Sequence, residues 1–224
     1  MCIRMCRMRT MRTATEAARR SGPVARALAV LRDEGFPVFW FKLLSALGVY
    51  RRLFILARPL AEPIGEFVPE VPVVVGMLTR AEVDAYVALR PEAESAAIVG
   101  RFDSGCLCFV ARHEGRAVGA CWIATGRAYS AHLACDLPLS AGDAYLFDAY
   151  TLPAYRGRGV APALCAHQLR YCRDAGWRRA IRATSPENRA ALRAHAKSGF
   201  RAAAVIGRVM IGSWRRFFSH PCDR

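Results

Sequence analysis

The sequence predicts an α/β protein with a three-layer α/β/α arrangement, in which a mixed sheet has helices on both faces. Two observations support this fold class. Strand-like and helix-like segments alternate over residues 145–200, which is typical of parallel strands joined by helices. Upstream, two apolar runs flank the turn His113-Glu-Gly-Arg116, which predicts an antiparallel hairpin. The 224 residues are enough for one such domain with an N-terminal extension.

The first part of the chain precedes this pattern. Residues 1–22 carry six arginines against Glu16, a net charge of +5, and they contain no apolar segment of signal-peptide length. We expect a disordered basic tail there, and a basic arm for an anionic surface is the alternative. Residues 23–71 are expected to form an extension and linker. Its predicted elements are helices over 23–32 and 37–47, a strand over 49–57 and a proline-rich linker over 59–72.

The helix predicted over residues 37–47 is apolar on nearly all sides. From Gly35 to Tyr50 only Lys42 is charged, but these sixteen residues are too few to span a bilayer. Packing of the helix and the next strand against the downstream domain is the favoured interpretation. The alternative is peripheral contact of residues 36–58 with a membrane surface through Phe39, Trp40 and Phe41.

Residues 72–218 contain the elements of the main domain. Thr79 is expected to cap a first helix, with Glu82 in the capping-box position. The irregular crossing over 125–142 contains three candidate substrate contacts, Tyr129, His132 and Asp136. The other predicted elements are strands over 73–75, 107–112, 117–125, 202–211 and 214–218 and a helix over 91–98.

The most informative stretch joins a strand to a helix through a basic turn that contains two glycines. The strand runs from Tyr145 to Leu152, and the turn Arg156-Gly-Arg-Gly-Val-Ala161 opens into a helix at Pro162. The glycines allow the backbone to approach a ligand closely, and the first amides of the helix are unpaired donors at the positive end of its dipole. This turn therefore predicts binding of a phosphate or pyrophosphate.

Spacing excludes two other phosphate-binding loops. A Walker loop requires Gly-x4-Gly-Lys-Ser/Thr, which the sequence lacks, and a dinucleotide fingerprint requires a third glycine where Pro162 stands. An ordinary strand-to-helix turn is the alternative interpretation of Gly157 and Gly159. A second strand and helix follow over 179–184 and 187–198, and Gly199-Phe200 ends that helix.

Two signatures in this region resemble those of the GNAT-type acyl-CoA-dependent N-acyltransferases. In the pyrophosphate loop of that family, Arg or Gln is followed by two variable residues, Gly, one variable residue and then Gly or Ala. Arg156, Gly159 and Ala161 take these places. The second signature is matched by Asn188, Ala191, Gly199 and Phe200, whereas His195 stands where Tyr is usual. The resemblance covers about residues 72–218.

This resemblance implies a GNAT-like fold and transfer of an acetyl or other acyl group from acyl-CoA to an amine. The amine would attack the thioester directly while both substrates are bound. The resemblance also implies cofactor contacts from the strand backbone near Thr151, from the loop and from Asn188, which would cap its helix as well. The loop residues are Arg156, Gly157, Arg158, Gly159, Val160 and Ala161.

The candidate general base is Asp148, a carboxylate inside an otherwise apolar strand. A lone charge there is costly unless it is paired or its pKa is shifted. Strict alternation places Leu146, Asp148 and Tyr150 on one face of the strand. An ion pair with Arg127 or Arg182 is the alternative explanation of Asp148.

Two residues are candidates for the acid that protonates the leaving thiolate. His195 takes the family's Tyr position, and a histidine titrates near neutral pH. Tyr150 is the second candidate. The alternatives are a half-buried helix residue for His195 and core packing for Tyr150.

Composition limits the cofactors and partners. Nine cysteines without a Cys-x-x-Cys pair and five scattered histidines predict buried thiols in a reducing compartment and no metal. Residues 156–216 carry 14 basic residues against Asp174 and Glu187, a net charge of +12, which suits the phosphates of coenzyme A. A nucleic-acid surface is the less favoured source of that charge.

The leading hypothesis is a cytoplasmic acyl-CoA N-acyltransferase, with acetyl as the expected acyl group, that acts on a small-molecule amine. The alternatives are a membrane-peripheral acyltransferase that uses longer acyl donors and a non-catalytic module that binds nucleic acid or regulates a partner. The sequence leaves open the acceptor amine, the acyl length and the oligomeric state.

Overall fold

The computed structural model describes residues 36–222. The chain divides into two compact units. The smaller unit comprises Met1–Arg51 and Arg208–Arg216, and the larger comprises Arg52–Gly207 and Phe217–Arg224. The helix predicted over 23–32 and the basic tail lie outside the described residues.

The smaller unit contains helix α3 (Phe36–Ala46), which confirms the helix predicted over 37–47. The helix is followed by Gly48, whose positive φ of 71° turns the chain into a strand. Several large apolar side chains of this unit are exposed: Phe36, Trp40, Leu47, Ile211 and Trp214. None of the helices within residues 36–222 is both long and apolar enough to cross a bilayer.

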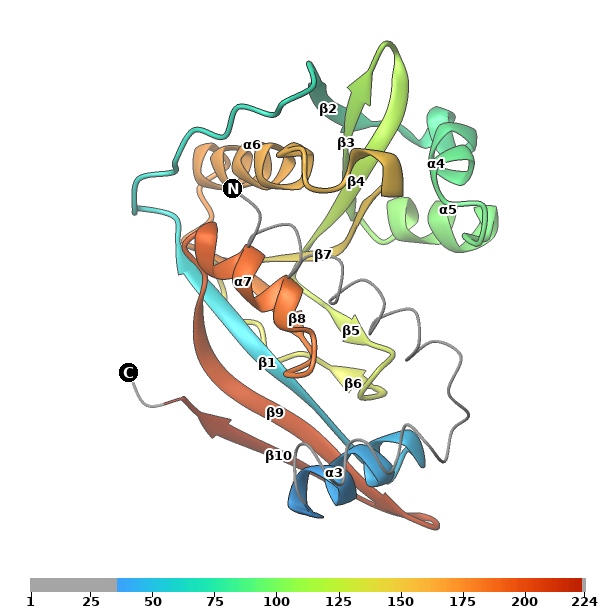
Figure 1. The fold of residues 1–224 in the computed structure, drawn as a ribbon, viewed down its shortest axis with the longest axis vertical. Helices are drawn as coiled ribbons and strands as arrows, with labels where there is room; N and C mark the ends of the chain where they lie inside the picture. The colour runs from blue at the N-terminus through green and yellow to red at the C-terminus, as the bar shows by residue number, and fades with distance from the viewer. Residues whose placement is uncertain (1–35, 223–224) are drawn as a thin grey trace, which may run out of the picture. The chain divides into compact units, whose positions relative to one another are not determined.

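The main sheet has eight strands in the order β10-β9-β1-β8-β7-β4-β3-β2 (Figure 1). Strands β7 and β8 pair in parallel, whereas β1 with β8, β4 with β7, β3 with β4 and β2 with β3 pair antiparallel. The predicted mixed sheet is therefore confirmed. The strands are β1 (Tyr50–Pro59), β2 (Val74–Leu78), β3 (Leu107–His113), β4 (Arg116–Thr125), β7 (Asp143–Thr151), β8 (Arg179–Thr184), β9 (Arg201–Ile211) and β10 (Trp214–Pro221).

Helices cover both faces of the sheet in the larger unit (Figure 1). Helix α6 (Val160–Asp174) packs on one face, where Phe109, Cys121 and Ile123 point. Helices α4 (Val83–Leu89) and α5 (Ser95–Asp103) pack on the other face. Neighbouring residues of β4 alternate between these two apolar clusters, as a strand requires. The remaining elements are α7 (Arg189–Lys197), the 3₁₀ turns η1 (Arg80–Glu82) and η2 (Pro153–Tyr155), and the two-residue strands β5 (Tyr129–Ser130) and β6 (Cys135–Asp136).

Strand β1 belongs to the main sheet although it precedes the main domain in the sequence pattern. It pairs with β8 from Phe54 opposite Thr184 to Pro59 opposite Arg179. Leu53, Ile55 and Leu56 are buried there. The strand predicted over 49–57 is thus confirmed, and its pairing partner is the second parallel strand.

Two local predictions need correction. The helix predicted over 91–98 is α5, which begins only at Ser95, because residues 91–94 form a turn in which Ala93 N–H bonds to Arg90 O at 2.8 Å. The expected alternation along β7 also fails. Asp148 has a positive φ of 51°, and the register with β4 shifts between Ala120 and Trp122. This bulge separates Leu146 from Tyr150: Leu146 packs on the α6 face, whereas Tyr150 packs on the α4 face.

Arg58 joins three segments of the larger unit from a buried position on β1. Its guanidinium donates hydrogen bonds to Ser198 O, to Glu62 O and, at 2.7 Å, to Pro63 O. Its side chain is 5% exposed. Arg52 lies on the same strand but forms a 3.5 Å ion pair with Glu187 in which both side chains are exposed.

We predict that Arg58→Ala lowers the free energy of unfolding by about 2–4 kcal/mol, because three carbonyl groups, among them that of the buried Ser198, lose a charged donor. Arg52→Ala is the matched control on the same strand, and its cost is below about 1 kcal/mol. Urea unfolding followed by circular dichroism measures both. Equal effects of the two substitutions would contradict the prediction.

Candidate functional site

The site is built where the parallel strands β7 and β8 separate. They pair only from Asp143 with Arg179 to Tyr145 with Ile181, although β7 continues to Thr151. A cavity of about 170 Å³ opens between the separated ends, α6 and α7. Residues that line it include Cys121, Tyr150, Thr151, Ala161, Arg182 and His195. The bulge at Asp148 lies in the part of β7 that is not paired with β8, three residues beyond Tyr145.

The predicted phosphate loop lies beside this cavity. Helix α6 begins at Val160, and Gly159 is its N-cap with φ 78°. Gly157 has φ 79°, so both glycines adopt the left-handed backbone that side chains disfavour. The first amides of a helix have no intrahelical acceptor and point out of its N-terminus. Ala161 and Pro162 in the first turn of α6 line the cavity together with Thr151, so this end of the helix borders it.

The proline-rich linker contributes to the loop, which sequence reasoning missed. Glu70 N–H donates to Arg158 O at 2.9 Å. A Cβ atom added at Gly159 would lie 3.0 Å from Pro69 Cα, so the linker backbone allows only glycine there. No pattern in the linker itself signals this contact, because it depends on backbone groups.

Arg156, the first residue of the loop signature, bonds back to the strand. Its Nε donates to Thr151 O at 3.0 Å, and its guanidinium lies 5.9 Å from the centre of the Tyr150 ring. These contacts connect the loop to the end of β7. They place Tyr150 at the edge of the cavity that it lines.

Asp148 is held by three side chains from the helical layer. Arg90 and Tyr86 donate hydrogen bonds to its carboxylate, and Arg101 donates one at 2.6 Å. Burial opposes ionisation of this carboxyl, but the hydrogen bond and charge of Arg101, together with Arg90, outweigh it and lower the pKa of Asp148. The ion pair is therefore with Arg90 and Arg101 and not with Arg127 or Arg182.

His195 lines the cavity from α7 and packs edge-on against Phe200, with ring centres 6.0 Å apart. Burial, with a smaller effect of Arg182, lowers the pKa of His195 to about 4. The imidazole is neutral at pH 7, so it is a poor source of a proton for a thiolate.

Asn188 acts as the cap of α7. Its Oδ1 accepts a hydrogen bond from Ala191 N at 3.0 Å, and its side chain is not among those that line the cavity. The structure thus gives a physical reason for the Asn of the second signature. Any contact of Asn188 with a cofactor stays a prediction.

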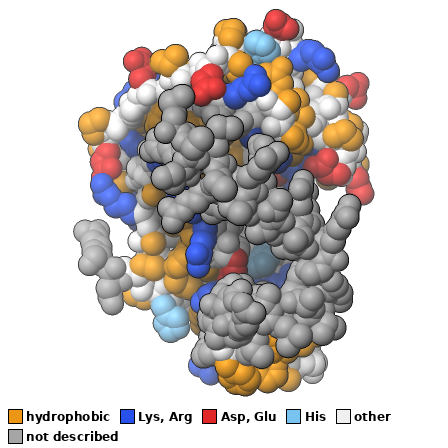
Figure 2. Space-filling view, viewed as in Figure 1, with side chains coloured by type: hydrophobic (Ala, Val, Ile, Leu, Met, Phe, Trp, Pro, Cys, Tyr) orange, Lys and Arg blue, Asp and Glu red, His pale blue; other side chains and the backbone are white. Residues whose placement is uncertain are grey.

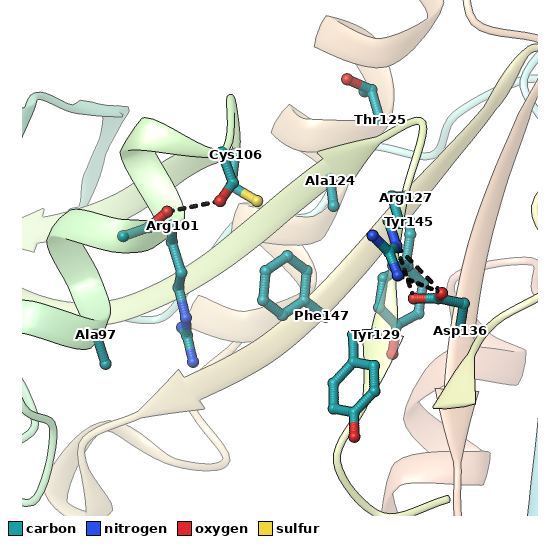
Figure 3. Close-up of a pocket in the computed structure, with 13 residues that line it drawn as sticks. Ala97, Arg101, Cys106, Ala124, Thr125, Arg127, Tyr129, Asp136, Tyr145 and Phe147 are labelled. Atoms are coloured by element: carbon teal, nitrogen blue, oxygen red, sulfur yellow. Dashed lines mark hydrogen bonds and ion pairs between the residues drawn. The ribbon is translucent and has the colours of Figure 1, made fainter. Parts of the chain in front are cut away.

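A larger cavity of about 500 Å³ lies against α5, β5, β6 and β7 (Figure 3). The stacked rings of Tyr145 and Phe147, 5.5 Å apart, form part of its wall. Tyr129 and Asp136 line this cavity, as expected for substrate contacts, whereas His132 is not one of the lining residues. Asp136 accepts hydrogen bonds from both Nε and NH2 of Arg127 (Figure 3).

Strand β7 separates the two cavities. Its residues Ala149, Tyr150 and Thr151 line the smaller one, and Tyr145 and Phe147 line the larger one. The larger cavity also includes Arg101, which bonds to Asp148 at the bulge. One strand therefore contributes to the walls of both cavities.

Basic and acidic side chains lie close together on the surface. On the part of the surface visible in Figure 2, Lys and Arg side chains lie among Asp and Glu side chains. Among the ion pairs of the described residues are Arg112 with Glu82 and Arg127 with Asp136. Within residues 36–222, no three His, Cys, Asp or Glu side chains are grouped so that they could hold a metal ion.

Comparison with known proteins gives a consistent result. A family model described as the acetyltransferase (GNAT) family matches residues 76–200. The crystal structure of a GCN5-related N-acetyltransferase from Sphaerobacter thermophilus is 20% identical and covers 75% of this chain and 54% of that chain, with a TM-score of 0.52. The aminoglycoside N-acetyltransferase AAC(6')-Iy in complex with CoA is 25% identical and covers 57% of this chain and 91% of that chain, with a TM-score of 0.46.

The first of these structures shows a shared fold. The chain spans about half the length of the Sphaerobacter protein, 54% of it. No curated protein matches the sequence.

We predict that His195 makes stability depend on pH below neutrality. Its folded pKa of about 4 lies below the ordinary value of 6.5, so the unfolded chain binds the proton first as pH falls. The wild-type protein should lose about 1–2 kcal/mol between pH 6.5 and pH 4 from this group, a figure reduced for the partial exposure of the ring. His195→Tyr should lack this loss, and the two stabilities should run parallel above pH 6.5. Urea unfolding at each pH measures the difference, and identical pH profiles would refute the prediction.

Proposed function

The chain belongs to the GNAT acetyltransferase family, and on this premise we propose that it transfers an acyl group from acyl-CoA to the amine of a small molecule. The observation that carries the proposal is the separation of β7 from β8 beside a helix N-terminus, with one cavity on each side of β7. A donor and an acceptor bound on these two sides would meet at the bulge in β7. Direct attack in a ternary complex follows from this arrangement.

The smaller cavity fits the donor. Its mouth has the helix amides that suit a pyrophosphate, and Gly159 leaves no room for a side chain between the loop and the linker. The residues that would hold the coenzyme are the loop Arg156, Gly157, Arg158, Gly159, Val160 and Ala161, with Thr151 at the strand end and Asn188 at α7. Bound acyl-CoA supplies an activated thioester. The unpaired backbone edge of β7 beyond Tyr145 would position its carbonyl group.

The larger cavity fits the acceptor. Its aromatic walls suit an amine substrate, because ring faces attract positive charge, whereas the carboxylate of Asp136 is already paired with Arg127. Tyr129 is 63% exposed at this cavity and is available for contact with a ligand. A small-molecule amine is therefore the proposed acceptor class.

Asp148 is the proposed acceptor of the amine proton. Its lowered pKa makes it a weak base, which is sufficient once the nitrogen has begun to bond to the carbonyl carbon and has become acidic. Arg90 and Arg101 keep the carboxylate ionised and in place. Tyr150 is the proposed donor of a proton to the leaving thiolate in preference to His195, whose imidazole is neutral at pH 7.

The membrane contact of residues 36–58 stays a second, separate proposal. The exposed side chains of Phe36, Trp40 and Leu47 support it, since such groups favour the interface of a bilayer. On the face visible in Figure 2, basic side chains are mixed with acidic ones, which does not favour a nucleic-acid surface on that face.

We predict that Ala161→Glu abolishes coenzyme binding while the protein stays folded. A carboxylate in the first turn of α6 is favourable for the helix dipole but repels a pyrophosphate. Calorimetry with CoA should show at least a tenfold weaker affinity for Ala161→Glu than for Ala161→Gln, which has the same size without the charge. Equal affinities of the two variants would place the phosphates elsewhere, and a wild-type protein that binds no CoA would refute the proposed function.

We also predict different effects of substitutions at the two candidate acids. In a screen of amines with acyl-CoA, measured by release of the free thiol, Tyr150→Phe should lower kcat by about 10²-fold with little change in KM for the donor. His195→Asn should retain kcat within about threefold, because a neutral ring contributes little to proton donation. The reverse order of effects would assign the acid to His195.

A further inference from the structure

Arg182 is a buried cation at the inner end of the donor cavity. It lies on β8 one residue beyond the last pair with β7, and it is 6% exposed. Its NH2 group is 3.5 Å from Cys165 Sγ and 3.9 Å from Cys121 Sγ. Its guanidinium lies 5.4 Å from the centre of the Phe200 ring, and its Nε has no hydrogen-bond partner among residues 36–222.

No carboxylate within the described residues forms an ion pair with Arg182. The nearby strand residue Arg179 differs, because its Nε bonds to Asp143 at 2.8 Å. Sulfur is a weak acceptor, and burial raises the pKa of the Cys121 thiol, so this sulfur supplies no negative charge at neutral pH. A buried guanidinium with such neighbours is costly unless a ligand provides the counter-charge.

The neighbours of Arg182 on β8 indicate that packing alone does not require a charged side chain at this position. Ala180, two residues earlier, points to the same face of β8 and belongs to the apolar cluster with Leu164 and Leu169 of α6. An apolar side chain would therefore fit at position 182. Among the side chains that line the cavity, that of Arg182 is the one positive charge at pH 7, since His195 is neutral there.

The phosphates of a coenzyme are not the matching anion. They suit the helix N-terminus near Ala161, whereas Arg182 contacts Cys165, four residues further along α6. Arg182 also lies one residue beyond the last pair of β7 and β8, at the end of the separation where the two strands meet. We take the acyl chain, which is the end of the donor furthest from its phosphates, as the group that reaches this end.

We propose that Arg182 recognises a carboxylate at the end of the acyl chain, so that the preferred donor is the CoA thioester of a short dicarboxylic acid. This inference rests on the proposed function and refines its donor. The guanidinium offers Nε and NH2 as two parallel donors, the geometry that suits a carboxylate. Gln168, whose Nε2 bonds to Cys121 O at 3.2 Å, leaves its buried Oε1 as an acceptor for an N–H group of the donor's arm.

Calorimetry with matched thioesters tests the proposal. Malonyl-CoA is compared with isovaleryl-CoA, which has the same shape without the charge, and succinyl-CoA is compared with 4-methylpentanoyl-CoA. CoA itself serves as the reference for the common part. In at least one pair the wild-type protein should bind the acidic thioester ten or more times more tightly than the neutral one. Arg182→Met should remove this preference and keep the affinity for CoA within about threefold.

The other outcomes are decisive as well. Equal affinity within both pairs, with CoA still bound, overturns the inference and leaves the proposed function intact. A preference for the acidic thioester that survives Arg182→Met also overturns it, because the carboxylate is then recognised elsewhere. An equal loss of turnover with acetyl-CoA and with malonyl-CoA in the variant would assign Arg182 to the leaving thiolate instead. Failure of the wild-type protein to bind CoA refutes the proposed function itself. If Arg182→Met does not fold, the wild-type comparison alone still decides.

Discussion

The interaction on which the site depends is the ion pair of Asp148 with Arg90 and Arg101. It holds Asp148, whose backbone φ is positive, in the middle of β7, where a regular strand would have extended backbone. The bulge shifts the register with β4 and lies in the part of β7 that no longer pairs with β8. It changes which residues of β7 face the smaller cavity, since Leu146 and Tyr150 pack on opposite faces.

The arginines of this chain have distinct physical roles that a net charge does not distinguish. Arg58 is a buried link between backbone carbonyl groups, and Arg179 neutralises the buried Asp143. Arg101 holds the bulge from α5. Arg182 differs from these because it is buried without a carbonyl or carboxylate partner among the described residues. The charge of +12 over residues 156–216 is therefore partly structural and only partly available to ligands.

Much of the fold could be predicted because local patterns determine where strands and helices form. The hairpin around Glu114 and Gly115, the helix after Gly159 and the strand at 179–184 were all predictable from turn residues and alternation. The predictions failed where residues distant in the sequence determine the local backbone conformation. Alternation along β7 breaks at Asp148 because Tyr86, Arg90 and Arg101 bind its carboxylate, and nothing adjacent in the sequence signals a bulge.

The sequence by itself determined the family resemblance and the glycine-containing turn before α6, because both depend on residue types at fixed spacing in short segments. Only the tertiary structure decided which charges are paired. It placed Arg90 and Arg101 beside Asp148 and placed Arg182 beside two sulfur atoms. It also buried His195, which lowers the pKa of that side chain. It also placed the linker at Pro69 against Gly159. The physical reason is that ionisation and hydrogen bonding depend on distance and burial, which residues far apart in the chain create together only when the sheet is assembled.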